Sequence, residues 1–165
     1  MTVTFVSLTE KDAQYISDRV FSWWVEIYGE EISTGIEGLK SIFAREETSD
    51  HILEHMSKGT AYCDVSLNGK VVGMVAYRPG PEEFYIDKLY LDSSVRGMGI
   101  GGECLEHMID IARSRGCTKV RLHVSPGNKG AYRFYLSHGF VFDFIEEITD
   151  CFGVVGERHH LVRLL

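Results

Sequence analysis

The sequence lacks several features that mark common classes of protein. It has no apolar run near the ~18 residues of a membrane-spanning helix, and its first residues lack the basic start and long apolar segment of a secretory signal. Its four cysteines (Cys63, Cys104, Cys117, Cys151) form no Cys-x-x-Cys pair, so neither a zinc site nor a disulfide framework is expected. We therefore predict a single domain over residues 1–165, located in the cytoplasm, with reduced thiols, no metal and no membrane partner.

Positive charge is also scarce. The chain has 17 Lys and Arg against 24 Asp and Glu, which gives a formal net charge of −7. Binding to a nucleic-acid backbone needs a basic face, so we expect no nucleic-acid partner. The acidic residues can serve solubility alone, or they can attract a cationic ligand, and the composition leaves both readings open.

What is present is a clear alternation of helical and strand periodicity. Strands are predicted at residues 2–8, 61–67, 70–77, 84–91, 119–124, 140–148 and 159–164. Helices are predicted up to about residue 29 and at 36–45, 49–56, 103–115 and 129–137. Asn68-Gly69 between two β-rich runs is a strong hairpin signal. This pattern predicts an α+β fold, with a mixed sheet and helices on both of its faces.

One glycine-rich loop separates the strand at 84–91 from the helix that follows. Glycine lets the backbone pass close to a ligand, and a helix N-terminus adds positive potential there. The loop is therefore predicted to hold a pyrophosphate on its main-chain N–H groups, and its residues are Arg96, Gly97, Met98, Gly99, Ile100, Gly101 and Gly102.

Two common phosphate motifs do not explain this loop. Gly97, Gly99 and Gly102 satisfy the Gly-x-Gly-x-x-Gly dinucleotide pattern, but that pattern also needs an acidic residue about 20 positions later. Residues 118–124 contain no carboxylate. The Gly-x-x-x-x-Gly-Lys-Ser/Thr loop is absent from the sequence.

A third pattern fits. Arg96-x-x-Gly99-x-Gly101 resembles the acetyl-coenzyme A loop of the GNAT superfamily of N-acetyltransferases. A second GNAT signature is matched downstream, in the expected order, by Asn128, Ala131, Tyr135, Gly139 and Phe140. The resemblance covers residues 61–142, with Ser93 where the family often has proline. It implies the GNAT fold, with a mostly antiparallel central sheet, and acetyl-coenzyme A as the cofactor.

The resemblance also implies roles for individual residues. The backbone of Leu89, Tyr90 and Leu91 would pair with the pantetheine arm, and the Leu91 N–H would polarise the thioester carbonyl. The loop 96–102 would hold the pyrophosphate. Asn128 would bond the pantetheine arm or the acceptor side, although it can equally form a local turn.

Tyr135 is our candidate for the general acid, because the departing coenzyme A thiolate needs a proton that a phenol can supply. Its other reading is a core aromatic residue. An amine acceptor must also lose a proton, and Asp87, Glu83 and His123 are candidate bases, each of which can instead be structural. Asp87 is the base that we select. No cysteine lies within the two motifs, so we expect direct acetyl transfer without an acetyl-enzyme.

The first helix and the loop after it shape the acceptor pocket in such folds. Aromatic and acidic residues gather there, and Tyr28 is the candidate substrate-binding residue. This N-terminal pattern resembles PaiA-type polyamine acetyltransferases, which favours a small cationic amine such as a polyamine. A peptide or protein amine is the alternative acceptor, and a non-catalytic acyl-coenzyme A sensor is the alternative function. Monomer and homodimer are both left open. The other members of the aromatic and acidic group are Trp23, Trp24, Glu30 and Glu31.

Overall fold

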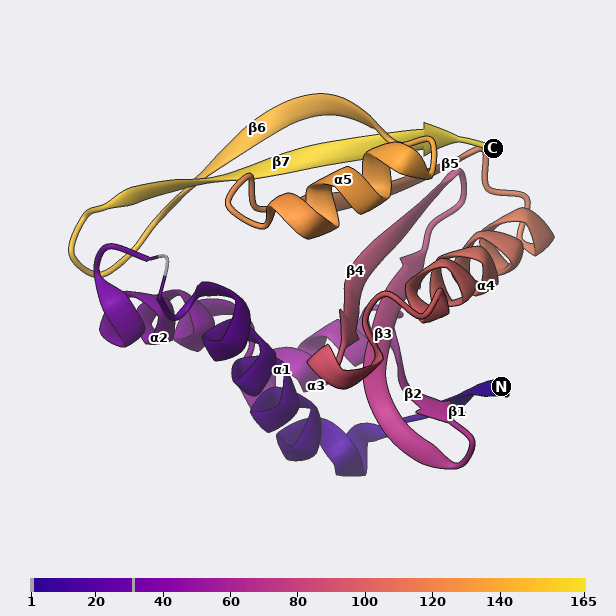
Figure 1. The fold of residues 1–165 in the computed structure, drawn as a ribbon, viewed down its shortest axis with the longest axis horizontal. Coiled ribbons are helices and arrows are strands. Elements are labelled where there is room, and N and C mark those ends of the chain that lie inside the picture. The colour runs from indigo at the N-terminus through magenta and orange to yellow at the C-terminus, as the bar shows by residue number, and fades with distance from the viewer. Residues whose placement is uncertain (1, 31) are drawn as a thin grey trace. The chain divides into compact units, whose positions relative to one another are not determined.

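The structure is a computed structural model that describes residues 2–30 and 32–165, so Glu31 lies outside the described residues (Figure 1). The chain divides into two compact units that interleave in the sequence. The first unit comprises Met1–Lys11, Met56–Leu122 and Leu164–Leu165, and the second comprises Asp12–His55 and His123–Arg163. The single domain over 1–165 stays a prediction.

The first unit is built on a sheet. Its strands are β1 (Val3–Ser7), β2 (Ala61–Leu67), β3 (Lys70–Pro79), β4 (Glu83–Leu91) and the start of β5 (Lys119–Val124). Strands β1 to β4 pair antiparallel in chain order. The predicted hairpin between β2 and β3 is confirmed, with φ of 50° at Asn68 and 84° at Gly69, as a two-residue turn of that hand requires.

The β4–β5 pair is parallel, from Glu83 opposite Lys119 to Ile86 opposite Leu122. A parallel neighbour needs a crossover connection, and helix α4 (Ile100–Ser114) supplies it. This helix packs on β3 and β4 and buries one apolar stripe completely, because its apolar residues recur every three to four positions. The stripe includes Leu105, Met108 and Ile109.

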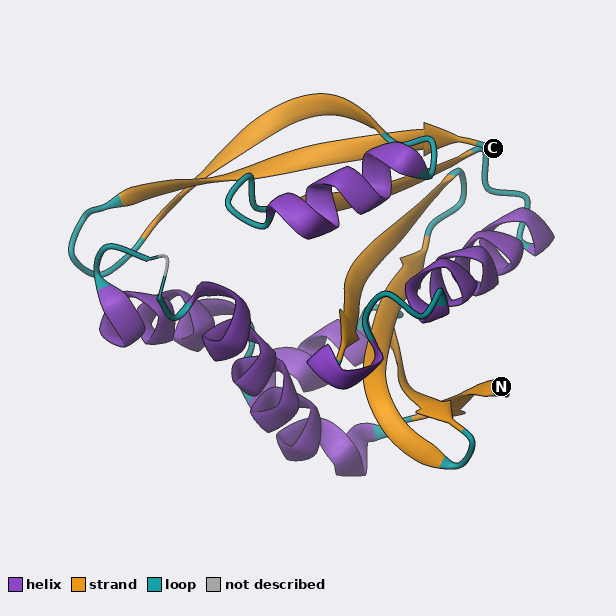
Figure 2. Cartoon of the chain, viewed as in Figure 1, coloured by secondary structure: helices purple, strands orange, loops and turns teal. Residues whose placement is uncertain are grey.

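The second unit holds most of the helices and a long hairpin. Its elements are α1 (Ala13–Tyr28), α2 (Gly35–Glu46), most of α3 (Ser49–Ser57), α5 (Lys129–Ser137), β6 (Val141–Thr149) and β7 (Val155–Leu164) (Figure 2). A short 3-10 turn, η1 (Glu10–Asp12), precedes α1. Strand β7 begins four residues before its predicted start. Residues 155–158 have no apolar alternation, but they pair with β6 as far as Val155 opposite Thr149.

Helices cover both faces of the β6–β7 hairpin. Consecutive residues of a strand point to opposite faces. On β7, His159 contacts Tyr132 of α5, whereas the next residue back, Arg158, bonds Glu46 of α2. Helices therefore lie on both faces of this hairpin, as predicted, and the parallel β4–β5 pair makes the sheet of the first unit mixed, as predicted. No helix in the described chain is long and apolar enough to cross a membrane.

Candidate functional site

At the end of β4, the backbone N–H and C=O groups of successive residues point in two directions, toward β3 and away from it. The N–H of Asp92 donates to the carbonyl of Val72 at 2.8 Å, and hydrogen-bonded pairs alternate along an antiparallel ladder. Tyr90, opposite Met74, therefore turns its backbone groups toward β3, while Leu89 and Leu91 turn theirs away from β3. The backbone that can add a cofactor as an extra strand is thus that of Leu89 and Leu91. Any contribution of Tyr90 would come from its side chain.

Arg96 is tied to this strand end. Its Nε donates to the carbonyl of Leu91 at 3.0 Å, so this carbonyl already has a partner within the protein. A 3-10 turn, η2 (Ser93–Val95), brings the chain around between the two residues. The bond fixes the beginning of the glycine loop to the strand that would carry the thioester.

The glycine loop leads directly into α4. Gly97 and Gly99 have φ of 77° and 84°, in the left-handed region that side chains rarely adopt. Gly99 is the N-cap of α4, so the helix begins at Ile100, three residues earlier than predicted. Gly101 and Gly102 belong to its first turn, and Gly99 has no side chain to cap that turn. The first N–H groups of α4 are thus left for an anion.

Asp87, the selected base, lies in a β-bulge. Ala76 pairs with Lys88 and Tyr77 with Ile86, so Asp87 is the extra residue of β4. Its carboxylate forms an ion pair of 2.9 Å with the buried ammonium group of Lys88. The Lys88 ammonium group bonds one of the two carboxylate oxygens, Oδ2. Glu83, another candidate base, is held by Lys119 and Arg121 at 3.3 and 3.1 Å.

The second signature lies on α5 and just before it. Asn128 is the N-cap of α5, and its side-chain oxygen accepts the N–H of Ala131 at 3.3 Å. Asn128 thus has a local structural role as the cap of α5. Its amide NH₂ group is left to donate elsewhere. Tyr135 is buried, and burial raises the pKa of its phenol well above the usual range. A phenol in this state stays protonated at neutral pH.

Tyr28, the predicted substrate-binding residue, lies near Tyr135. The Tyr28 phenol adds a smaller upward effect on the pKa of Tyr135, so the two groups interact electrostatically. Tyr28 also meets Trp24 edge to face, with 6.4 Å between ring centroids. Trp23 and Trp24 are themselves buried, at 1% and 8% exposure, so of these aromatic residues only Tyr28 is half-exposed.

The thiols do not form a nucleophilic or metal-binding group. Cys63, Cys104 and Cys117 are buried and Cys151 is exposed, and all four are free. Burial raises the pKa of Cys63, and it raises that of Cys104 to about 12, so these thiols stay protonated and weakly nucleophilic. The described residues contain no cluster of side chains suited to a metal ion.

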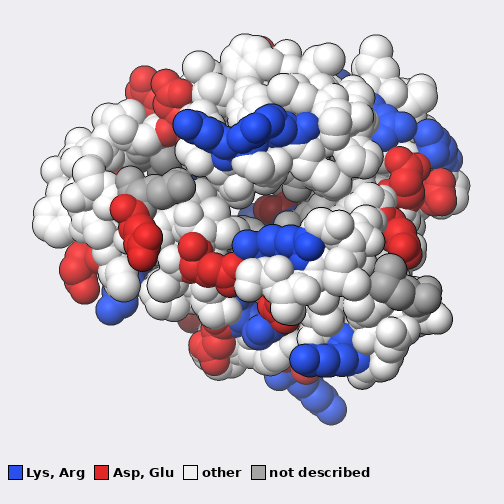
Figure 3. All heavy atoms as spheres, viewed as in Figure 1, with Lys and Arg blue, Asp and Glu red and all other residues white. Residues whose placement is uncertain are grey.

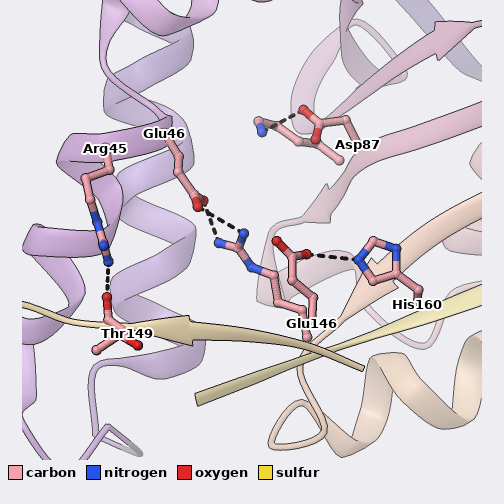
Figure 4. A network of polar contacts seen from close by, with 8 residues as sticks. Arg45, Glu46, Asp87, Glu146, Thr149 and His160 are labelled. Atoms are coloured by element: carbon pink, nitrogen blue, oxygen red, sulfur yellow. Dashed lines mark hydrogen bonds and ion pairs between the residues drawn. The ribbon is translucent and has the colours of Figure 1, made fainter. Parts of the chain in front are cut away.

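A polar network in the second unit was not anticipated from the sequence (Figure 4). Arg158 bonds both carboxylate oxygens of Glu46, and Arg45 donates to the carbonyl of Thr149. Glu146 and His160 form a pair of 2.9 Å across the β6–β7 hairpin. Their 14-residue separation gives no local signal, and only the register of the hairpin brings them together.

Asp150 organises the turn between β6 and β7. It accepts the hydroxyl of Thr34 at 2.6 Å and the N–H groups of Phe152 and Val154 at 2.9 and 3.0 Å. These bonds lower the pKa of Asp150, with the Thr34 hydroxyl as the largest cause. The start of α2 and the β6–β7 turn are thereby joined within the same unit.

Charges of both signs are present on the face of the molecule drawn in Figure 3. The basic and acidic side chains form separate small groups there, and the described residues form no broad basic area on this face.

Comparisons with known proteins point in one direction. Residues 18–140 match the Acetyltransferase (GNAT) family. The chain is 34% identical over 96 residues to an uncharacterized N-acetyltransferase of Methanocaldococcus jannaschii, covering 54% of this chain and 42% of that protein. It is 34% identical over 78 residues to a thialysine N-epsilon-acetyltransferase of Bos taurus, covering 44% and 43%. The matched segments thus span less than half the length of these two relatives.

Among solved structures, a PaiA N-acetyltransferase from Thermoplasma acidophilum in complex with coenzyme A superposes with a TM-score of 0.80. The superposition covers 100% of both chains at 16% sequence identity, which establishes likeness of fold. The family match over residues 18–140 and the structural match over the whole chain both include residues of the first and the second unit.

Proposed function

The chain belongs to the GNAT acetyltransferase family, and on that premise we propose that it transfers the acetyl group of acetyl-coenzyme A to a primary amine. The transfer is direct, within a ternary complex. The amine nitrogen attacks the thioester carbonyl carbon, the new C–N bond forms and the C–S bond breaks. The products are the N-acetylated amine and coenzyme A.

The observation that carries this proposal is the conformation of the glycine loop. Two left-handed glycines, Gly97 and Gly99, lead into the uncapped first turn of α4. Backbone N–H groups and the positive end of the helix then suit a pyrophosphate without a lysine. Arg96 is held at Leu91 beside them. Loop residues 96–102 are accordingly proposed to bind the cofactor.

The remaining cofactor and catalytic roles follow the same premise. The Leu91 N–H is proposed to polarise the carbonyl, with Leu89 and Asn128 along the pantetheine arm. Tyr135 is proposed to protonate the departing thiolate. Its phenol is protonated at neutral pH, so the proton is present when the C–S bond breaks.

The acceptor is proposed to be a small cationic amine such as a polyamine. The net charge of −7 favours a cation over an anionic acceptor. Tyr28 supplies an aromatic surface near Tyr135 on which an alkylammonium group can rest. A relative of this chain is a thialysine N-epsilon-acetyltransferase, which is in keeping with an amine acceptor. Action in the cytoplasm, as a monomer or homodimer, completes the proposal.

The test is release of coenzyme A thiol across a panel of polyamines, lysine-like amines and peptide N-termini. Release with a polyamine is the expected result. Release only with peptides would replace the acceptor, while tight acetyl-coenzyme A binding without release from any amine would favour a sensor.

The cofactor site has its own test. Gly99→Glu places a side chain and a negative charge at the proposed pyrophosphate position, so calorimetry should detect no acetyl-coenzyme A binding. Gly59→Glu is the matched control, because Gly59 also has a positive φ, of 99°, and open space around it. It should fold with similar strain and still bind the cofactor. Unchanged binding in Gly99→Glu would remove the basis for the proposal.

A further inference from the structure

Strand β6 lies at the edge of the sheet and is exposed along most of its length. It pairs with β7 on one side, and no described strand pairs with its other side. All its residues except Ile148 are exposed, and Phe144 and Ile145 are 45% and 47% exposed. Long apolar edge strands invite pairing with another chain, and proteins commonly block them with lysine or proline. Strand β6 contains neither residue type, so its edge is open to a further strand.

The turn after β6 shows which of its backbone groups point outward. The N–H of Asp150 donates to the carbonyl of Val154 at 3.1 Å, so the backbone of Asp150 faces β7. Hydrogen-bonded and non-hydrogen-bonded pairs alternate along an antiparallel ladder. Ile145, Glu147 and Thr149 therefore turn their N–H and C=O groups away from β7, toward the open side of β6.

One of these outward groups already has a cationic partner. The guanidinium group of Arg45 on α2 donates to the carbonyl of Thr149 (Figure 4). The outward N–H and C=O groups of Ile145 and Glu147 have no partner among the residues that the structure describes. A donor and an acceptor at every second residue are what a strand added to the edge would pair with.

The charges on β6 disfavour a second copy of the chain as the added strand. Its charged residues are all acidic, namely Asp143, Glu146 and Glu147. In an antiparallel pair of β6 strands, a two-fold axis at Glu146 or at Glu147 places identical carboxylates opposite each other. An axis at Ile145 brings Asp143 near Glu147 of the second copy. Like charges that face each other across strands are destabilising, whereas basic side chains at the same positions are favourable.

Glu147 is the acidic residue that most needs a cation beside it. It stands directly opposite Glu157 in the hairpin, so two carboxylates face each other. Glu157 forms a hydrogen bond of 2.9 Å with His159. The carboxylate of Glu147 has no ion-pair partner in the described part of the chain. A basic side chain on the open side of β6 would offset the repulsion between the two glutamates.

We propose that the outer edge of β6, over residues 144–149, binds an extended segment of a partner protein in which basic and apolar residues alternate. A bulge at Asp143 limits the regular edge to this stretch. The backbone of Ile145 and Glu147 supplies the hydrogen bonds. Successive side chains of a strand point to opposite faces, so the basic residues meet Glu147 on one face and the apolar residues meet Phe144 on the other. This surface is independent of the proposed acetyl transfer.

The probe is a peptide of alternating arginine and valine, acetylated at its N-terminus and amidated at its C-terminus. It contains no amine that the enzyme could acetylate, so its binding is distinct from that of an acceptor. A peptide of alternating glutamate and valine is the control of opposite charge. Calorimetry should detect binding of the arginine peptide alone. Bound peptide should slow amide hydrogen exchange at Ile145 and Glu147 and leave that of Glu146, which already faces β7, unchanged.

Two charge variants separate this edge from the general negative field of the protein. Glu147→Lys should weaken binding of the arginine peptide about 10-fold or more. The new lysine lies opposite Glu157, which favours the folded hairpin. Asp110→Lys makes the same change of charge at an exposed position of α4 and should leave the affinity within about 2-fold of the wild type.

A backbone variant tests the pairing itself. Ile145→Pro removes an N–H that points away from β7, so it should abolish peptide binding while the β6–β7 ladder is kept. Ile145→Val keeps the N–H and should bind as the wild type does. Thermal melts and acetyl-coenzyme A affinity check that both variants are folded, and Glu147→Lys tests the surface independently if Ile145→Pro does not fold.

Three results would overturn the inference and leave acetyl transfer untouched. The first is equal binding, or no binding, of the two peptides. The second is binding that Glu147→Lys does not weaken or that leaves amide exchange at Ile145 unchanged. The third is a wild type that binds no peptide and sediments as a dimer that Ile145→Pro dissociates, because a second copy would then cover the edge.

Discussion

At the residue scale, Tyr135 is set apart by its burial. An exposed phenol has a pKa near 10 and is protonated at neutral pH, and burial raises the pKa of Tyr135 further, so its phenol is protonated as well. The sequence motif marks this tyrosine among its neighbours. The tertiary structure supplies the burial, and because a raised pKa weakens an acid, the proposed role of Tyr135 depends on its position rather than on its acidity.

Replacing Tyr135 by phenylalanine should lower turnover about 100-fold and leave acetyl-coenzyme A affinity nearly unchanged, because only the proton donor is lost. Steady-state thiol release and calorimetry measure the two effects. Tyr132→Phe is the control. It loses the bond to His159 and should cost about 1 kcal/mol of stability while turnover is kept. Equal turnover in Tyr135→Phe and the wild type would contradict the acid role.

Gly73 is a second residue whose importance lies in its contacts. A Cβ at this position would lie 2.3 Å from the Tyr90 carbonyl oxygen and 2.7 Å from the Leu91 side chain. The glycine thus permits close approach of β3 to the end of β4, where the thioester is proposed to bind.

Gly73→Ala should destabilise the protein by about 1–3 kcal/mol, because backbone must shift to admit the methyl group. Gly130→Ala is the matched change in a helix, where a Cβ meets nothing within 4 Å. That change should be neutral or stabilising by up to about 1 kcal/mol. Chemical denaturation of both variants measures the difference, and a neutral Gly73→Ala would contradict the close packing.

At the element scale, α4 is anchored to β1 through a stacked pair. The rings of Phe5 and His107 are parallel within 3°, with 3.8 Å between centroids. Burial lowers the pKa of His107, and Asp110 opposes this with a smaller effect. The packed state of α4 thus favours the neutral imidazole.

This pKa shift has a defined consequence for stability. The folded pKa lies below the unfolded value of 6.5, so the unfolded chain binds more protons between the two values. The contribution of His107 is therefore present above about pH 6.5 and is lost as the pH falls below it. His107→Phe should show a smaller fall in melting temperature than the wild type between about pH 7 and about pH 5. Parallel curves for the two proteins would rule out a contribution from His107.

At the scale of the whole molecule, the net charge of −7 gives the chain a negative field. Such a field raises the local concentration of cations, and salt screens it over about 8 Å at physiological ionic strength. The composition thus bears on how an acceptor is attracted and says little about how it is bound.

If a polyamine is the acceptor, its kcat/KM should fall as salt is added, mainly through a rise in KM. A neutral amine of similar length serves as the control and should show little salt dependence. Initial rates over a range of salt concentrations measure the effect. Equal salt dependence for the charged and neutral amines would remove the electrostatic argument for a polyamine.

The sequence by itself determined most of the elements and the cofactor motif. Strand β2 and helix α5 begin and end where predicted, because a change of hydrophobic period and turn residues bounds each of them. The glycine loop and the Tyr135 signature are local patterns, so they can be read along the chain. The start of α4 was predicted three residues too late, because glycine has a low helix propensity and Gly101 and Gly102 were therefore not assigned to the helix.

Only the tertiary structure decided which side chains meet across long separations. The bulge at Asp87 and its pairing with Lys88 depend on the register of β3 against β4. The Glu146–His160 pair depends on the register of β6 against β7, and the orientation of the His160 ring depends on its stacking with Phe144. Register and burial arise from contacts between distant segments, and a single sequence carries no local pattern that specifies them.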